Sequence, residues 1–298
     1  MNDTLYIVIP CYNEEEVLHE TVKRLTAKFD KMIEENSISE NSRIMLVNDG
    51  SKDRTWEIIN ELYTSNKYVT GVCLSRNKGH QNALLAGLMT AKEYADMVIS
   101  MDADLQDDVD AVDKFVEEYK NGAEIVYGVR NSRKKDTFFK KTTALMFYRL
   151  MSKRALNELA NFKEVNLFLR GIIPMIGFKT AIVEYERNER FAGESKYPLS
   201  KMISFAVEGI TSCSVKPLRM ITSAGLIVSF LSFIYLIYVI IGFCMGRNIQ
   251  GWTTTVVLIC LFGGAQILCL GIIGEYVGKI YNEVKQRPRF IISEELLK

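Results

Sequence analysis

Short apolar runs alternate with amphipathic helical patterns along the first two thirds of the chain. Five of these runs have the length and the composition of strands. They are Leu5–Ile9, Arg43–Val47, Val69–Leu74, Met97–Met101 and Glu124–Val129. Because strands and helices alternate, the pattern predicts an α/β fold with a Rossmann-like, mostly parallel sheet that is covered on both faces.

Two long runs without Asp, Glu, Lys or Arg follow, at Met220–Gly246 and Asn248–Gly274. Each is longer than the roughly 20 residues that a helix needs to cross a bilayer. The alternative is two buried helices of a soluble core, but core helices rarely run this long without a polar face. Since only a short segment around Arg247 separates the runs, the sequence predicts a hairpin of two transmembrane helices, at 220–245 and 253–275.

Basic residues flank the outer ends of this hairpin, whereas its joint carries only Arg247. The flanking residues are Lys216, Arg219, Lys279, Lys285, Arg287 and Arg289. Because Lys and Arg favour the cytoplasmic side, we expect a multi-pass protein of the cytoplasmic (inner) membrane with the N-terminal domain and both termini in the cytoplasm. Met1–Thr4 lacks a basic region, so no cleaved signal is expected.

These patterns divide the chain into four segments. We expect a folded domain at 1–198, an amphipathic juxtamembrane segment at 199–218, the transmembrane hairpin at 219–281 and a cytoplasmic tail at 282–298. The amphipathic pattern around Leu199–Val215 is typical of a segment that lies along a membrane surface.

The composition limits the remaining choices. A formal net charge of +1 gives no overall field that would favour nucleic acid. The six cysteines form no CxxC pair and no zinc spacing, which indicates apolar fillers in a reducing compartment. With only His19 and His80 in the chain, a Ser-His-Asp triad or a histidine-rich metal site is disfavoured.

Polar clusters follow three of the predicted strands, at Tyr12–Glu14, Asp49–Ser51 and Asp102–Gln106. In parallel sheets the carboxyl ends of the strands share one edge, and ligands bind there. No Gly-x-Gly-x-x-Gly or Walker motif follows any strand, so the backbone phosphate cradle of a dinucleotide or P-loop site is missing.

Asp102 and Asp104 stand two residues apart at the end of a predicted strand, with Gln106 close behind. Hard cations such as Mg²⁺ or Mn²⁺ prefer such oxygen ligands and share them with substrate phosphates. The alternative is a solvated acidic loop. We assign Asp107, Asp108 and the nearby Asp110 to the start of the following helix, where acidic residues complement the helix dipole.

Three motifs occur in a characteristic order: Pro10-Cys-Tyr-Asn-Glu14, Val47-Asn-Asp-Gly-Ser51 and Asp102-Ala-Asp-Leu-Gln106. Together they resemble the inverting nucleotide-sugar glycosyltransferases of family 2, which have a GT-A fold. With the hairpin, the chain is similar to the polyisoprenyl-phosphate glycosyltransferases, relatives of dolichyl-phosphate mannose synthase. Arg190–Lys196 and Gly271–Tyr281, followed by Arg287-Pro288, extend the resemblance over nearly the whole chain.

The resemblance implies roles for individual residues. The substrate-binding residues would be Pro10, Tyr12, Glu14, Val47, Asp49, Asp102, Ala103 and Arg130. The metal ligands, for Mg²⁺ or Mn²⁺, would be Asp104, Gln106 and Asp102. Simpler roles stay open for three of these residues: packing for Tyr12, a turn cap for Asp49 and a plain surface position for Arg130.

The resemblance also implies the chemistry. Asp104, Arg190 and Lys196 would be catalytic, the two cations closing over the diphosphate and a lipid phosphate; their alternative role is contact with lipid headgroups. The reaction would be inverting transfer of one hexose, with glucose or GlcNAc favoured, from a nucleotide sugar to undecaprenyl or another polyprenyl phosphate. A UDP-sugar is the favoured donor, and the product would serve cell-envelope glycosylation. The sequence leaves open whether hairpins pack together into a homo-oligomer.

One region departs from the family pattern. Members carry an additional segment that ends in an Asp-Tyr-Arg-Leu-like motif on the acceptor side, whereas here Phe147 directly precedes Tyr148-Arg149-Leu150 and no Asp does. There are two alternatives to the transferase. A non-catalytic, nucleotide-sugar-binding membrane relative is favoured by this shortened region. A processive polysaccharide synthase is disfavoured, because more membrane helices and a Gln-x-x-Arg-Trp motif would be needed.

Overall fold

The computed structural model describes residues 2–130, 148–165, 168–185, 216–245 and 251–298. The chain divides into two compact units. The first is Met1–Lys196 together with Pro288–Lys298, and the second is Tyr197–Arg287. Of the expected juxtamembrane segment 199–218, residues 199–215 lie outside the described residues, and 216–218 begin a helix.

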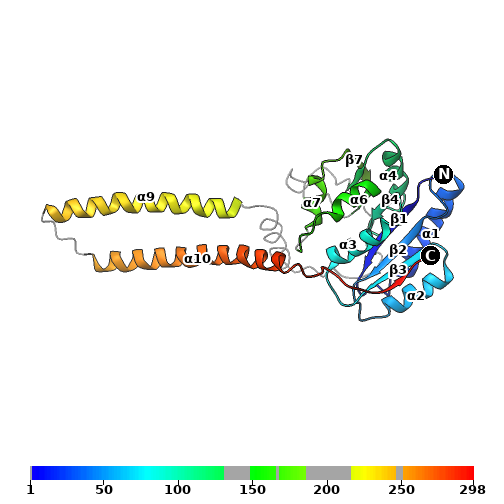
Figure 1. Ribbon diagram of the computed structural model, residues 1–298, viewed down its shortest axis with the longest axis horizontal. Helices are drawn as coiled ribbons and strands as arrows, with labels where there is room; N and C mark the ends of the chain where they lie inside the picture. The colour runs from blue at the N-terminus through cyan, green and yellow to red at the C-terminus, as the bar shows by residue number, and fades with distance from the viewer. Residues whose placement is uncertain (1, 131–147, 166–167, 186–215, 246–250) are drawn as a thin grey trace. The chain divides into compact units, whose positions relative to one another are not determined.

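One sheet forms the centre of the first unit (Figure 1). Its strands are β1 (Leu5–Cys11), β2 (Arg43–Asn48), β3 (Val69–Leu74), β4 (Met97–Ser100), β5 (Ile125–Arg130), β6 (Arg149–Ser152), β7 (Thr180–Tyr185) and β8 (Ile292–Leu296). The strand order is β7-β5-β6-β4-β1-β2-β3-β8, and the central strands β4, β1, β2 and β3 are mutually parallel. The five predicted strands and the mostly parallel α/β fold are confirmed.

Helices cover both faces of this sheet (Figure 1). The helices of the first unit are α1 (Leu18–Glu34), α2 (Thr55–Ser65), α3 (His80–Ala91), α4 (Ala111–Lys120), α6 (Lys153–Ala160) and α7 (Leu169–Met175). Apolar side chains of α1, α2 and α4 pack in one core layer, and those of α3, α6 and α7 pack in the other. Every residue of β1 is buried, as expected for a strand that is covered on both faces.

The strand register places the carboxyl ends of the central strands at one edge. Cys11 at the end of β1 pairs with Asn48 at the end of β2, and Asn48 pairs with Cys73 near the end of β3. On the other side of β1, Val8 pairs with Ser100 at the end of β4. The loops that follow these strands therefore begin next to one another, which creates the edge on which the polar clusters lie.

Three strands were not predicted from the sequence. β6 has only four residues and runs antiparallel between β4 and β5, while β7 runs parallel to β5. β8 lies in the expected C-terminal tail and pairs antiparallel with β3. The chain thus returns from the hairpin to complete the sheet of the first unit.

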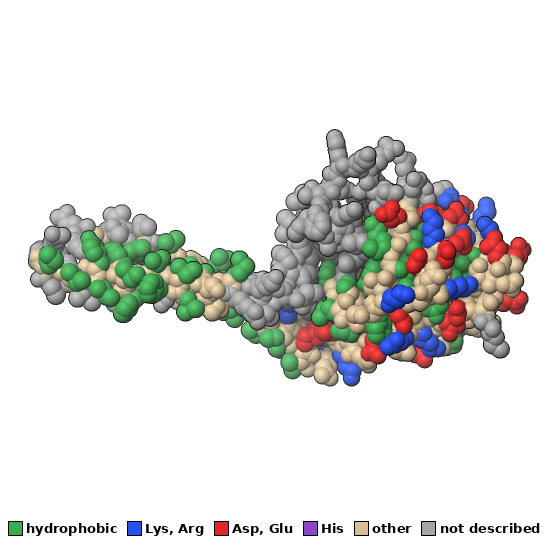
Figure 2. Space-filling model, turned by 90° about the horizontal axis from the view of Figure 1, so that it is seen from above, with side chains coloured by type: hydrophobic (Ala, Val, Ile, Leu, Met, Phe, Trp, Pro, Cys, Tyr) green, Lys and Arg blue, Asp and Glu red, His purple; other side chains and the backbone are tan. Residues whose placement is uncertain are grey.

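The second unit contains two long helices, α9 (Lys216–Cys244) and α10 (Trp252–Val284). Among the described residues, one stretch is long and apolar enough to cross a membrane, Leu261–Val284, and the apolar stretch Met220–Tyr235 in α9 is shorter. Figure 2 shows hydrophobic side chains over the helices of this unit, whereas Lys, Arg, Asp and Glu are mixed on the visible face of the first unit. Most of the exposed large apolar side chains of the described residues lie between Met220 and Val284.

Candidate active site

The loop after β1 is bound to the loop after β2. Asn13 has a left-handed backbone, with a φ of 55°, and its amide donates a hydrogen bond to Ser51 Oγ at 3.0 Å. The next amide, of Glu14, donates to Thr55 Oγ1, also at 3.0 Å. The first two polar clusters of the sequence therefore form one connected surface.

The buried carboxylate of Asp49 joins the loop after β2 to the loop after β3. Its Oδ1 accepts a hydrogen bond from the Lys78 amide at 2.7 Å, and its Oδ2 accepts one from the Gly79 amide at 2.9 Å. Asp49 is only 2% exposed, and burial raises the pKa of its carboxyl, a shift opposed by the two amides and by nearby His80. Asp49 therefore shapes the loop at the start of α3.

Gly50 makes the same junction sterically tight. Its φ is 62°, in the left-handed region that residues with a Cβ avoid. A Cβ at this position would lie 2.5 Å from the Asn77 backbone nitrogen and 2.6 Å from the Arg76 carbonyl carbon. The loop after β2 thus approaches the loop after β3 as closely as a glycine permits.

The segment after β4 alternates between core and surface. Ala103 and Leu105 are buried, whereas Asp102, Asp104 and Gln106 are half-buried. The Gln106 amide donates to Asp104 Oδ1 at 3.2 Å, and Leu105 has a left-handed φ of 56° that turns the chain there. The structure thus brings the two predicted metal-binding carboxylates to the edge where the other polar clusters lie.

The oxygen atoms of these side chains suit a hard divalent cation that also binds phosphate oxygens of the substrate. Within the described part of the chain, no group of three or more His, Cys, Asp and Glu residues could hold a metal ion. Asp102 and Asp104 supply carboxylate oxygens, and Gln106 Oε1 is a buried oxygen without a hydrogen-bond partner among the described residues. Mg²⁺ commonly binds one or two carboxylates and completes its coordination with water and phosphate oxygens. The residues present therefore fit Mg²⁺ or Mn²⁺.

His80 is a residue of this site that the sequence analysis did not assign. It is the first residue of α3, and its Nε2 lies 3.1 Å from Asp102 Oδ1. The signal was present in the sequence, because Asn77–Gln81 is a polar cluster after the predicted strand Val69–Leu74. The same rule that selected the other three clusters would have selected this one.

The assignment of Asp107 to a helix start was wrong. Its side chain is 1% exposed, and its Oδ1 accepts a hydrogen bond from the Tyr185 hydroxyl on β7 at 2.7 Å. The assignment holds for the next acids, because Asp110 is the N-cap residue of α4 and its amide donates to Asp108 Oδ1 at 2.9 Å. A buried acid of this kind has no local sequence signal, since its partner is 78 residues away.

The shortened region leads into β6 next to this buried acid. The Tyr148 hydroxyl donates to the Asp108 carbonyl at 2.9 Å, and its ring packs edge-to-face on Tyr185 at 5.2 Å. Burial raises the pKa of Tyr148 well above its ordinary value, and the nearby acids Asp107 and Asp108 add to the shift. Arg149, the first residue of β6, is 2% exposed, so its guanidinium is also buried.

The other expected substrate-binding residues have different positions. Pro10 and Val47 lie within β1 and β2, pair with each other and are buried. Tyr12 is 41% exposed at the edge of the site. Arg130 ends β5, where it pairs with Tyr185 of β7.

Two of the expected catalytic residues, Arg190 and Lys196, lie outside the described residues. Asp104 is therefore the one member of the expected catalytic set for which the structure gives a position.

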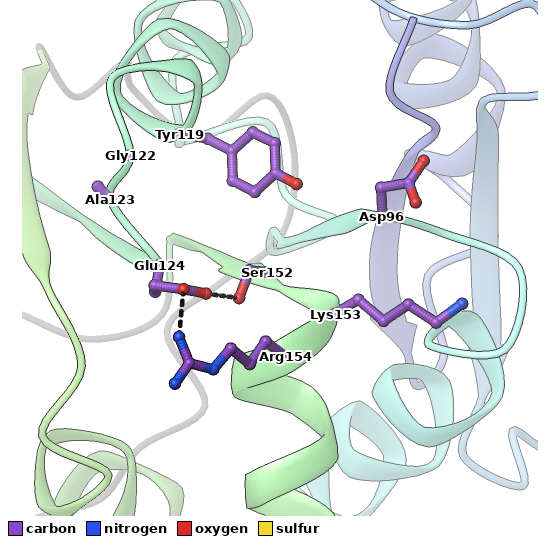
Figure 3. A pocket seen from close by; sticks show the side chains of 8 residues that line it. All are labelled: Asp96, Tyr119, Gly122, Ala123, Glu124, Ser152, Lys153 and Arg154. Carbon is purple, nitrogen blue, oxygen red and sulfur yellow. Dashed lines mark hydrogen bonds and ion pairs between the residues drawn. The ribbon is translucent and has the colours of Figure 1, made fainter. Parts of the chain in front are cut away.

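An open cavity of about 390 Å³ lies away from these clusters. Figure 3 shows its lining, which comes from residues just before β4 and β5 and from the start of α6. Glu124 there binds Arg154 at 3.2 Å and accepts a hydrogen bond from Ser152 Oγ at 2.5 Å. The cavity faces the amino ends of the parallel strands, so it is separate from the candidate active site.

Comparison with known families matches both units. Residues 6–185 match the model of glycosyl transferase family 2, and residues 216–280 match the GtrB C-terminal hairpin. In solved structures, glucosyl-3-phosphoglycerate synthase of Mycobacterium tuberculosis, in complex with Mn²⁺, UDP-glucose and phosphoglyceric acid, is 17% identical, with a TM-score of 0.46 over 67% of this chain and 74% of that one.

Curated relatives match over almost the full length of this chain. The glycosyltransferase YkoT of Bacillus subtilis is 52% identical over 309 residues, which cover 98% of this chain and 92% of the relative. The bactoprenol glucosyl transferase of Shigella phage SfII is 37% identical over 310 residues, 97% of each chain. Because these alignments exceed the 298 residues of this chain, each relative has additional residues inside the aligned region. The chain belongs to glycosyltransferase family 2 and is a glycosyltransferase with a GtrB-type C-terminal hairpin.

Proposed function

We propose that this glycosyltransferase moves one glucose from UDP-glucose to polyprenyl phosphate at the cytoplasmic membrane. The observation that carries the proposal is the joining of four strand-end loops around Asp49 and Asp102–Gln106, in a chain that also carries the hairpin of its relatives. Relatives named bactoprenol glucosyl transferase, at 37% identity over 97% of this chain, support glucose and the lipid acceptor.

The donor would lie along the edge formed by these loops. Tyr12 and Glu14 would border the nucleoside, and the Asp49-bound loop would close the same end. Asp102 and Asp104 would face the diphosphate, and with Gln106 they would hold the metal. Bound Mg²⁺ or Mn²⁺ supplies charge stabilisation to the nucleoside diphosphate as it leaves.

The acceptor needs orientation more than activation. A phosphate monoester with a second pKa of about 6 is largely dianionic near neutral pH, so its oxygen can attack the anomeric carbon without a general base. Attack opposite the leaving group inverts the anomeric centre, which turns an α-linked donor into a β-linked lipid phosphate sugar. Arg130, Arg190 and Lys196 would supply the positive charge for the two phosphates.

The hairpin would hold the enzyme where its acceptor is. Two apolar stretches joined near Arg247, with basic residues at both outer ends, support a multi-pass orientation with both termini in the cytoplasm. A polyprenyl tail in the bilayer would then present its phosphate on the cytoplasmic side, where nucleotide sugars are made.

The shortened region supports a second candidate function. The relatives have additional residues inside the alignment, and Tyr148-Arg149 lacks the preceding Asp that the acceptor motif of the family carries. A protein that binds the nucleotide sugar and does not turn it over would have an intact donor side and an incomplete acceptor side.

A donor and acceptor panel separates the two. Membranes that contain the protein are incubated with Mg²⁺, undecaprenyl phosphate and radiolabelled UDP-glucose, UDP-GlcNAc or GDP-mannose, and the lipid is extracted. We expect label from UDP-glucose in the organic phase, with a β-anomeric proton in the product by NMR. If the protein binds UDP but no donor gives labelled lipid, the transferase proposal fails and the non-catalytic function is supported.

A further inference from the structure

His80 and Asp102 join two parts of the site that the sequence keeps apart. The imidazole Nε2 lies 3.1 Å from Asp102 Oδ1, and both side chains are about one-third exposed, so the pair lies at the surface of the site. We infer that His80 is a positioning residue that orients Asp102 for the diphosphate and its metal ion. This inference rests on the proposed function, because it gives the pair a role toward that donor.

Asp49 fixes the backbone that precedes His80. The two amides before His80 in the chain, those of Lys78 and Gly79, donate to the two oxygens of Asp49. Gly79 is the N-cap residue of α3 and has a φ of 86°, a value that glycine adopts without steric cost. His80 therefore starts α3 from a backbone fixed on the loop after β2.

The backbone on both sides of Asp102 is fixed by hydrogen bonds to β1 and α1. The amide of Met101, the residue before Asp102, donates to the Val8 carbonyl of β1 at 3.1 Å. The carbonyl of Ala103, the residue after it, accepts from the Thr21 hydroxyl of α1 at 2.9 Å. The hydrogen bond between the two side chains thus bridges two rigid backbones.

A bond between rigid supports can select one orientation of a carboxylate. As the Nε2–H tautomer, the imidazole donates to Oδ1 of Asp102 and so restricts the rotation of the carboxylate. Partners of this kind fix the orientation of metal-binding side chains, and their removal typically reduces metal affinity about 10–100-fold. His80 would also link the nucleoside end of the site, through Asp49, to the metal end.

Two substitutions test this role. In His80→Leu the side chain keeps much of its volume but has no hydrogen-bond donor, whereas in His80→Gln an amide N–H can reach Asp102 in place of Nε2. His19→Leu is the matched control, because His19 is exposed on α1 and lies outside the site. The measurements are Mn²⁺-dependent binding of UDP by calorimetry, the KM for UDP-glucose and kcat, and the melting temperature of each variant.

We expect His80→Leu to raise the Mn²⁺ concentration for half-maximal UDP binding about 10–100-fold. His80→Gln should recover most of this loss, and His19→Leu should match the wild type. A Leu variant with unchanged Mn²⁺ dependence would overturn the inference. So would equal losses in the Leu and Gln variants with a lowered melting temperature, because they would mean that the histidine only supports the fold.

The two claims can fail separately. If the wild type binds UDP with Mn²⁺ but transfers no glucose to lipid, the proposed function fails while the calorimetric comparison still tests His80. If transfer occurs and His80→Leu retains the wild-type Mn²⁺ dependence, only the inference about His80 fails.

Discussion

The two halves of the sheet edge are built in different ways. On the half that we propose for the donor, the donor half, the loops after the parallel strands β1, β2, β3 and β4 are joined mainly by hydrogen bonds between side chains and backbone amides. On the half that we propose for the acceptor, the acceptor half, the antiparallel β6 separates β4 from β5; Arg149 of β6 is buried, as are Asp107 and Tyr148. The donor half is therefore held by hydrogen bonds between strand-end loops, and the acceptor half is held by packed, buried side chains.

This difference indicates which activity the shortened region before Tyr148 affects. The hydrogen bonds from the Lys78 and Gly79 amides to Asp49 do not involve the segment before Tyr148. Buried Arg and Asp side chains need every partner, because an unpaired charge inside a protein is costly. The shortened region before Tyr148 lies on the half that depends on such partners, so we expect its effects on acceptor use and not on donor binding.

The largest expected effect is at the metal end of the donor half. Asp104→Ala should reduce glucose transfer at least 100-fold, since removal of one group that stabilises developing charge typically costs 10²–10³-fold. Transfer assays over a range of Mn²⁺ concentrations measure it. Asp110→Asn is the control, because Asp110 is exposed and binds Lys28, which Asp113 also binds. Wild-type metal dependence in Asp104→Ala would refute the ligand role.

The next effect tests the junction around Asp49. Asp49→Ala removes the carboxylate that accepts hydrogen bonds from two backbone amides. A hydrogen bond to a charged group typically contributes about 1.5–3 kcal/mol to stability. We expect the KM for UDP-glucose to rise about tenfold or more, with a smaller change in kcat. Asp49→Asn retains one carbonyl acceptor and should give an intermediate KM. Equal KM values for all three proteins would show that the junction does not support the donor site.

A third substitution probes the acceptor half. Tyr185→Phe removes the hydroxyl that donates to buried Asp107, which should lower the free energy of unfolding by about 1–3 kcal/mol. Thermal unfolding in detergent measures the change. The KM for UDP-glucose should stay at the wild-type value, because the two halves are supported separately. A large rise in that KM would contradict the comparison.

The smallest effect is expected at the opposite edge. Arg154→Ala removes an ion pair with Glu124 in which the arginine side chain is 69% exposed. Exposed pairs of this kind contribute at most about 1 kcal/mol. Transfer and melting temperature should therefore stay close to the wild type. A clear loss of transfer would mean that the cavity of Figure 3 takes part in function.

The sequence predicted the elements whose formation depends on residues adjacent in the chain. Five strands and three of the four polar clusters could be recognised, because apolar runs and the residues after them carry that information. β6 could not, since four residues give no period and its pairing is set by β4 and β5. β8 is an edge strand of mixed polarity that pairs with β3 more than 200 residues away, as the bond from Ser293 Oγ to the Cys73 carbonyl illustrates.

The residues of the site also divide into those with a local sequence signal and those whose position depends on distant contacts. The position of Asp102 and Asp104 at the shared edge could be predicted, because they directly follow a recognisable strand. Asp107 could not be separated from its neighbours, because its burial depends on Tyr185 of β7. The bond between His80 and Asp102 likewise joins two loops, and each loop alone indicates only a polar cluster.

The most direct test of the central claim compares UDP release with lipid labelling in one reaction. Purified protein in detergent receives Mn²⁺, radiolabelled UDP-glucose and increasing undecaprenyl phosphate. The account predicts saturable labelling of the lipid, with one UDP released for each glucose transferred, and loss of both in Asp104→Ala. Bound UDP-glucose with no labelled lipid at any acceptor concentration would contradict it.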